Sequence, residues 1–107
     1  MDRRTVLLAL AGLAAAAAVP ALAAPQIDPE GARVVGQAYL DAHPGRRFDA
    51  ARLRAELLPD GWTDAAAARL RARAARDFRE GRVFMHRGWW LSDTEGRLFA
   101  LAALTPD

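Results

Sequence analysis

Two histidines are the side chains of this 107-residue chain best suited to proton transfer or metal binding. His43 precedes Pro44 at the end of an expected helix, where a histidine commonly interacts with the last carbonyl groups, so we expect a structural role for it. His86 follows Met85, and both side chains are copper ligands. Two neighbouring ligands without a second histidine or a cysteine beside them are too few for a copper site. We therefore predict no metal centre and no bound cofactor.

The chain has no cysteine, which excludes disulfides, thiolate catalysis, cysteine-ligated zinc, iron–sulfur clusters and covalent haem attachment. Among the hydroxyls, Ser92 lacks a Gly-x-Ser-x-Gly elbow and is explained as a helix cap. The carboxylates of Asp93 and Glu95 point to different faces of a first helical turn, and no glycine-rich phosphate loop is present. We therefore expect the chain not to be an enzyme, with a hydrolase centred on Ser92 and His86 as a weaker alternative.

Trp89 and Trp90 are the most informative neighbours in the sequence. Successive side chains of a strand point to opposite faces, so if one ring fills the core the other faces solvent or a partner. Tryptophan is also enriched at interface hot spots. The opposing interpretation, in which helices cover both rings, fits the pattern equally well. The residues predicted to bind a partner or ligand are His86, Arg87, Trp89, Trp90 and Arg97.

The basic residues are all arginine, and 15 of them oppose 13 acidic residues. Two arginine–carboxylate pairs are spaced four residues apart in an expected helix, Arg73 with Asp77 and Arg76 with Glu80. Each such pair contributes about 0.2–0.5 kcal/mol when it forms. Because the positive charge is locally neutralised, we interpret these arginines as a solvated helix face and expect no nucleic-acid partner.

The elements that position these residues are four helices, each with a local start signal. The caps are Asp28, Asp49, Thr63 or Asp64, and Ser92, and the helices are expected over residues 28–42, 49–58, 63–80 and 92–104. Ser92 and Glu95 form a capping box for the last helix, which is apolar on nearly every side and is therefore a central core helix or part of an interface.

The third and longest helix has a predicted buried stripe formed by Ala67, Leu70, Ala74 and Phe78. Between the third and fourth helices, the runs Val83–Met85 and Trp89–Leu91 predict a short hairpin, whose turn uses the positive φ available to Gly88. The fold class predicted is mainly α: a small helical domain of about four helices with one short β-hairpin before the last helix, preceded by a cleavable signal segment.

The N-terminal segment has the three parts of an export signal. Arg3 and Arg4 give a positive start, residues 6–19 are apolar, and the small residues Ala21 and Ala23 precede the expected cleavage site. The apolar run is shorter than the roughly 20 residues of a stable membrane span, so an uncleaved anchor is the minor alternative. The predicted organisation is an export signal over residues 1–23 and a small helical domain over residues 24–107.

Residues 2–8 resemble the twin-arginine (Tat) motif, in which an arginine pair is followed by any residue and two apolar ones. Val6 and Leu7 supply the apolar positions, whereas the usual lysine after them and the usual serine or threonine before the pair are missing. The resemblance implies transport of an already folded protein to the periplasm through the Tat translocase, with the Sec route as the alternative. Because Tat cargo often travels with a cofactor or a partner, and no cofactor is expected here, we expect a partner.

Residues 88–95 resemble a Gly-Trp-x-Leu-Ser-x-Thr-Glu segment of small proteobacterial proteins that carry a Tat signal, and the likeness extends to residues 77–83 and 38–44. No established activity comes with that family. A looser similarity, in size, signal and helical content, is to small Tat-bearing subunits of periplasmic flavin-dependent dehydrogenases.

These resemblances imply an exported, non-catalytic accessory protein or small subunit of a larger periplasmic oxidoreductase of flavin or molybdenum type. The membrane would be met only transiently, through the signal segment. The alternative is a free-standing periplasmic binding module for a small apolar or anionic ligand, which would use the tryptophans with Arg87 and Arg97.

Overall fold

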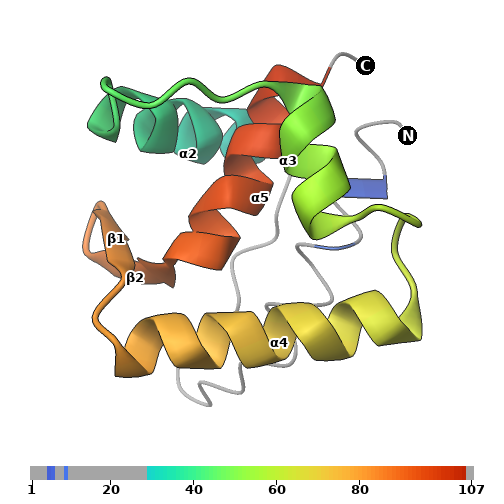
Figure 1. Cartoon of the computed structure of the whole chain (residues 1–107). Coiled ribbons are helices and arrows are strands. Elements are labelled where there is room, and N and C mark those ends of the chain that lie inside the picture. Colours follow the sequence, from blue (N-terminus) through green and yellow to red (C-terminus); the bar gives the residue numbers. More distant parts are fainter. Residues whose placement is uncertain (1–4, 7–8, 10–28, 106–107) are drawn as a thin grey trace.

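The computed structural model describes residues 5–6, 9 and 29–105 and is mainly helical (Figure 1). The elements with defined bounds are α2 (Pro29–Ala42), α3 (Ala50–Leu57), α4 (Asp64–Arg79), β1 (Val83–His86), β2 (Trp89–Ser92) and α5 (Asp93–Leu104). The two strands form an antiparallel hairpin directly before the last helix. The predicted fold class, a small helical domain with one hairpin before its last helix, is therefore confirmed.

The predicted export signal lies almost wholly outside the described residues. This applies to Arg3, Arg4, Ala21 and Ala23, and also to the predicted helix cap Asp28. Of the first 28 residues, only positions 5, 6 and 9 are described. All three are helical, and the side chains at positions 6 and 9 belong to the buried core. Within the described part of the chain, no helix is both long enough and apolar enough to cross a membrane.

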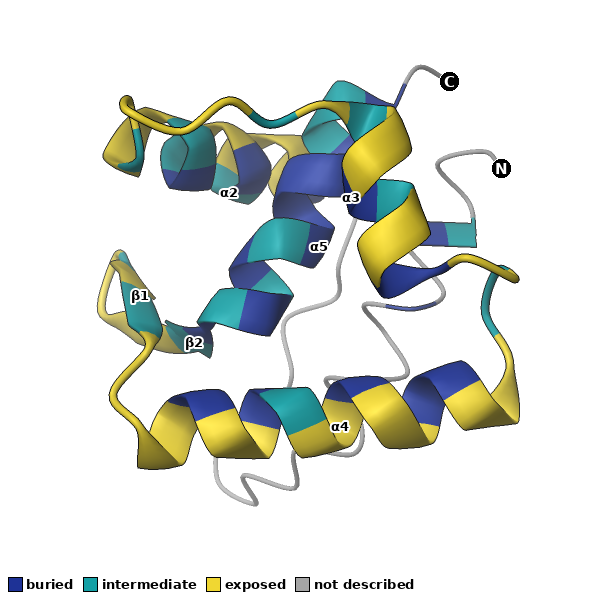
Figure 2. Cartoon of the chain, viewed as in Figure 1, coloured by how far each residue is buried: buried dark blue, intermediate teal, exposed yellow. Residues whose placement is uncertain are grey.

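Helix α5 is the central element of the fold. It packs against α2, α3, α4 and β2, and it crosses the middle of the molecule in Figure 1. Figure 2 shows mostly buried and half-buried residues along α5, whereas α4 turns its exposed residues outward. The buried apolar side chains of α5 are Leu98, Phe99, Ala100, Leu101 and Ala102. Of the two interpretations of this apolar helix, the central core helix is the one confirmed.

Helices α2 and α5 approach each other closely at two glycines. A Cβ atom on Gly36 would lie 2.1 Å from the carbonyl oxygen of Phe99, and one on Gly96 would lie 2.4 Å from the ring of Tyr39. Both distances are far inside van der Waals contact, so neither position has room for a larger residue without separating the helices. The two glycines thus set the distance between α2 and α5.

The other helix starts follow their predicted caps. The Asp49 carboxylate accepts from the Arg52 amide at 2.8 Å, and the Thr63 hydroxyl oxygen accepts from the Ala66 amide at 3.0 Å. The guanidinium of Arg69 then donates to the carbonyl of Leu57 at 2.6 Å, which satisfies an acceptor at the C-terminus of α3. Local signals therefore place α3 and α4 correctly, and a long-range hydrogen bond joins them.

The predicted stripe of α4 is wrong at its last position. Phe78 is 46% exposed, whereas Asp77 is only 5% exposed and lies on the inner side of the helix. Positions 77 and 78 both fit helical spacing after Ala74, but the N-terminus of α5 lies opposite α4 and needs an acceptor. Accepting hydrogen bonds from the buried N-terminus of α5 therefore stabilises the fold more than burying the Phe78 ring would.

The two predicted ion pairs, Arg73 with Asp77 and Arg76 with Glu80, are replaced by pairs with residues outside α4. Arg73 contacts Glu56 of α3 at 3.3 Å, and Glu80 pairs with Arg82. Asp77 is not available to Arg73 because it faces inward, where it binds α5.

The hairpin turn consists of Arg87 and Gly88, both at positive φ, 49° and 84°. A two-residue turn with both central residues at positive φ matches the right-handed twist of its strands. It fixes the register, in which Met85 faces Trp90 and His86 faces Trp89. Each strand is one residue longer than predicted.

We expect Gly36→Ala and Gly96→Ala each to lower the free energy of unfolding by about 1–3 kcal/mol, because the added methyl group must push α2 and α5 apart. Urea denaturation of the full chain, followed by circular dichroism, measures this. Gly45→Ala is the matched control, since a Cβ atom there meets nothing within 4 Å. Alanine favours a helix over glycine, so a gain of stability at position 36 or 96 would show that the close approach is not rigid.

Candidate functional site

The N-terminus of α5 is held by the buried carboxylate of Asp77. One of its oxygens accepts from the Thr94 amide at 2.8 Å and from the Thr94 hydroxyl at 2.6 Å. The other oxygen accepts from the Arg82 guanidinium at 3.2 Å. The Ser92–Glu95 capping box predicted from the sequence is confirmed beside it. Together these groups satisfy the amide donors at the start of the helix and place negative charge at the positive end of its dipole.

A second carboxylate, Asp93, connects α5 to α2. It accepts from the Tyr39 hydroxyl at 2.6 Å and from the Arg97 guanidinium at 2.9 Å. Burial acts to raise the pKa of Asp93, but these two hydrogen bonds and the nearby charges of Arg97 and Arg46 outweigh it, and its pKa lies below the ordinary value of 3.8. Burial, reinforced by the Asp93 carboxylate, raises the pKa of Tyr39 well above its usual range. Asp93 is therefore a stable anion and Tyr39 a stable donor.

Arg97 extends this network to α3. Its guanidinium donates to both carboxylate oxygens of Glu56, at 3.0 and 3.1 Å, and lies 5.9 Å from the centre of the Phe48 ring. The same carboxylate of Glu56 also accepts from Arg73 of α4 at 3.3 Å. One carboxylate of α3 thus joins arginines from α4 and α5.

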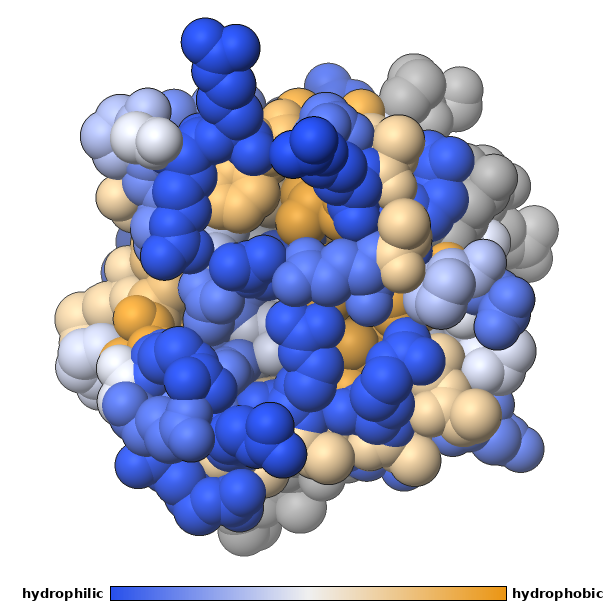
Figure 3. All heavy atoms as spheres, in the orientation of Figure 1, coloured by the Kyte–Doolittle hydropathy of each residue, from blue (hydrophilic) through white to orange (hydrophobic). Residues whose placement is uncertain are grey.

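A cavity of about 400 Å³ opens beside these networks, and we call it the arginine cavity. It is lined by the loop after α2, by α4, by the segment that leads into β1 and by α5. Figure 3 shows hydrophilic side chains gathered over the middle of this face, where the surface is hollowed. The arginines of its lining are Arg46, Arg73, Arg76, Arg82 and Arg97.

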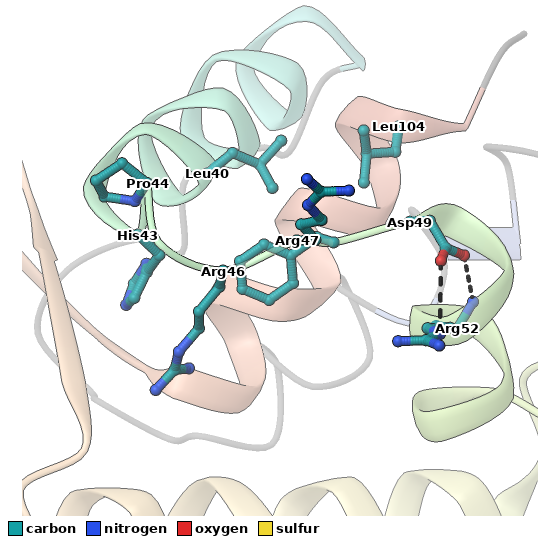
Figure 4. Close-up of a pocket in the computed structure, with 9 residues that line it drawn as sticks. Leu40, His43, Pro44, Arg46, Arg47, Asp49, Arg52 and Leu104 are labelled. Atoms are coloured by element: carbon teal, nitrogen blue, oxygen red, sulfur yellow. Dashed lines mark hydrogen bonds and ion pairs between the residues drawn. The ribbon is translucent and has the colours of Figure 1, made fainter.

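A second hollow of about 630 Å³ lies on the other side of the same loop and is more apolar. Leu40, Phe48 and Leu104 line it together with Arg47. Figure 4 shows that Arg46 and Arg47 leave the loop in opposite directions, and that Arg46 extends toward α4. The loop therefore directs one arginine into the arginine cavity and the next one away from it.

On the hairpin, Met85 and Trp90 are cross-strand partners on one face of the sheet and form an apolar patch, the hairpin surface, whereas Trp89 points to the other face. The exposed large apolar side chains of the hairpin are Met85, Trp89 and Trp90. These side chains are 48%, 43% and 59% exposed. The sequence left open whether one of the tryptophans fills the core, and neither does, since both rings are substantially exposed. In the described part of the chain the sheet has two strands, and the tryptophans belong to the two cross-strand pairs nearest the turn, whereas Phe84 and Leu91 further along the strands pack against the core. The interpretation in which helices cover both rings is wrong for the same reason.

The remaining predicted site residues do not form one site. The Nδ1 atom of His43 donates to the carbonyl of Tyr39 at 2.8 Å, which confirms its structural role at the end of α2. His86 is half-buried and stacks with Phe84, with ring centres 6.2 Å apart. Arg87 lies in the hairpin turn, whereas Arg97 is bound by carboxylates on the side of α3. His86, as the cross-strand partner of Trp89, and Arg87 therefore lie beside the two tryptophans, whereas Arg97 does not.

The residues weighed for catalysis are used by the fold. Ser92 is fully buried and exchanges hydrogen bonds with Glu95. It pairs with Val83 at the far end of the hairpin from His86, so the two do not form a nucleophile and base. Met85 and His86 are successive strand residues and point to opposite faces. Among the described residues, no three His, Cys, Asp or Glu side chains are grouped as metal ligands.

Sequence reasoning missed Met85 in the hairpin surface and Arg46 and Arg76 in the arginine cavity. For Met85 a signal existed: a two-residue turn at positions 87 and 88 places residue 85 opposite residue 90. For the arginines there was none, because Arg46 lies in a loop and Arg76 on an exposed helix face, and only the packing of α4 below that loop brings them to one cavity.

No family model, curated protein or solved structure matches this chain in comparisons of its sequence and fold. The candidate sites are therefore defined by their own geometry and charge.

Asp77→Ala is expected to lower the free energy of unfolding by about 3 kcal/mol, because the buried amide and hydroxyl of Thr94 both lose their acceptor. The matched control is Arg82→Ala, which removes a half-exposed ion-pair partner of the same carboxylate and is expected to lower the free energy of unfolding much less than Asp77→Ala, because water screens the pair. Chemical denaturation of the full chain measures both. Equal losses for the two variants would mean that the ion pair, and not the helix cap, is the stabilising contact.

The lowered pKa of Asp93 predicts a definite pH dependence. The unfolded chain takes up a proton at this carboxyl at higher pH than the folded chain, so the stabilisation is present above the ordinary value of 3.8 and is lost as the pH falls through the folded pKa. The difference in unfolding free energy between the native chain and Asp93→Asn should therefore be largest at neutral pH and shrink below about pH 4. Urea denaturation at a series of pH values measures it, and a difference that stays constant with pH would contradict the assignment.

Proposed function

We propose that this chain is an exported, non-catalytic accessory protein or small subunit that docks on a larger periplasmic protein through its hairpin surface. The single observation that carries the proposal is the exposure of Met85 and Trp90 side by side on one face of the hairpin, with Trp89 also exposed on its other face. Large apolar side chains grouped on a surface mark interaction sites, and tryptophan is the residue most enriched at interface hot spots.

The geometry of the hairpin suits docking. Met85 and Trp90 are cross-strand partners, so their side chains lie together on the same face of the sheet. The type of turn and the pairing of the strands hold them in place without any contribution from a partner, which lowers the entropy that binding must overcome. Removing one such anchor from an interface typically weakens binding by about 2 kcal/mol or more.

The charge of the hairpin indicates what the partner surface is like. Arg87 projects from the turn between the two strands and is exposed. In the described residues no carboxylate is recorded as its ion-pair partner. A partner with an apolar recess and a carboxylate at its rim would complement both the rings and the guanidinium.

The export part of the proposal is supported by the sequence of the first 23 residues. Arg3 and Arg4 resemble the twin-arginine motif, and Ala21 and Ala23 supply small residues before the cleavage position. The Tat route carries folded proteins, often with a cofactor or a partner bound. An oxidoreductase of flavin or molybdenum type is the class of partner that the resemblances favour.

Trp90→Asp is expected to weaken the complex about thirty-fold or more, because it places a charge where the partner recess is apolar. The full tagged chain is expressed in its native host and isolated from the periplasm. The protein that co-purifies with it is identified by mass spectrometry and quantified, and its flavin absorbance and molybdenum content are measured. Val34→Asp is the matched control, since Val34 is 40% exposed on α2, away from the hairpin. The docking proposal is overturned if the native chain is recovered only without a partner, or if both variants lose the partner to the same extent.

A second candidate function is a binding module for a small anionic ligand. The observation that favours it is the arginine cavity, whose lining has five arginines and two aspartates. The alternative derived from the sequence placed such a ligand beside the tryptophans, Arg87 and Arg97. Of these residues, Arg97 lines two of the three cavities found among the described residues, and the others line none of them.

A further inference from the structure

The carboxylates of the arginine cavity are already occupied by contacts within the fold. Asp77 accepts three hydrogen bonds, from Thr94 and Arg82, and Asp93 is held by Tyr39 and Arg97. Neither aspartate is therefore available to neutralise another arginine of the lining. With five arginines and two aspartates, the lining carries a formal charge of 5 − 2 = +3.

Two of the arginines have no anionic partner among the described residues. Arg97, Arg82 and Arg73 are each paired with a carboxylate. For Arg46 and Arg76, no side-chain hydrogen bond or ion pair is recorded among the described residues, and both are exposed. The charge of Arg46 is nevertheless felt inside the site, since it helps to lower the pKa of Asp93. These two guanidinium groups are the ones left to bind something else.

Arg46 and Arg76 come from opposite walls of the cavity. Arg46 belongs to the loop after α2 and extends toward α4, as Figure 4 shows, and Arg76 belongs to α4 itself, one turn after Arg73. A guanidinium matches a carboxylate with two parallel hydrogen bonds. Because the cations are on two walls of a cavity of about 400 Å³, rather than gathered at one point, the arrangement suits a ligand with anionic groups at both ends better than a single small ion.

We propose that the arginine cavity binds a small organic di- or tricarboxylate, with one carboxylate on Arg46 and another on Arg76. This inference rests on the second of the two proposed functions, the anion-binding module, and is independent of docking through the hairpin surface. The binding is electrostatic and partly exposed to solvent, so it weakens as the salt concentration rises.

The test is a titration of the full chain with citrate at low, constant ionic strength, followed by two-dimensional NMR of the backbone amides and the arginine Nε–H groups. We expect saturable shifts at Arg46, Arg73 and Arg76. Acetate, which has a single carboxylate, is expected to bind at least about tenfold more weakly, because it engages only one wall.

Arg46→Gln and Arg76→Gln are each expected to weaken citrate binding about tenfold or more. The midpoint of thermal unfolding should be unchanged in Arg76→Gln, and in Arg46→Gln it should fall only slightly, because Arg46 acts on the fold only through its charge near Asp93. Two variants serve as matched controls, and both should bind citrate as the native chain does. Arg47→Gln changes the neighbour that leaves the loop in the opposite direction, and Arg71→Gln changes an exposed arginine of α4 that is not part of the cavity lining.

The outcomes separate the inference from the function on which it rests. Citrate binding that is equal in Arg46→Gln and Arg47→Gln overturns the site. Inorganic phosphate that binds as tightly as citrate, with the same dependence on Arg46 and Arg76, overturns the ligand class and leaves the binding module standing. Absence of saturable binding by citrate, phosphate and acetate overturns both, and the docking proposal is unaffected.

Discussion

The hydrogen-bonding requirement at the N-terminus of α5 is the constraint on which the rest of the structure depends. The first amide groups of a helix have no acceptor within the helix, and those of the central helix of a small domain are shielded from water. The acceptors here are the carboxylate of Asp77, the carbonyl of Arg82 and the hydroxyl of Ser92. They belong to α4, to the segment after it and to β2. Satisfying one helix end therefore fixes three other segments around it.

The same requirement shapes the charge of the surface. Asp77, Asp93 and Glu56 hold α5, α2 and α3 together through contacts with Thr94, Tyr39 and Arg97, so they are not available to the remaining arginines of this face. The numbers of arginines and carboxylates in the chain are nearly equal, yet on this face the arginines outnumber the carboxylates that are available to them. The arginine cavity is thus a by-product of how the core is assembled, and the proposed anion site follows from it. The hairpin surface is made by different segments, so docking and anion binding are physically separate properties of one small domain.

Several elements could be predicted because their causes are local. A capping residue, a glycine with positive φ or an apolar residue every three or four positions acts within a few residues of itself. Asp49, Thr63, Ser92 and Gly88 all have the roles that such signals indicate. For the hairpin, the sequence identified the tryptophans as candidate contact residues. Their exposure could not be predicted, because it depends on where the hairpin lies relative to the core.

By itself the sequence determined the order and type of the elements, the absence of cysteine chemistry and the roles of His43 and Ser92 as caps. Only the tertiary structure decided that Asp77 and not Phe78 faces inward, that Gly36 and Gly96 set the distance between α2 and α5, and that Arg46 and Arg76 share a cavity. The physical reason is the distance along the chain between the residues that interact. Caps and turns are satisfied by the neighbouring residues, whereas a buried acceptor, a close helix contact or a charged cavity is defined by what packs opposite, which no local pattern encodes.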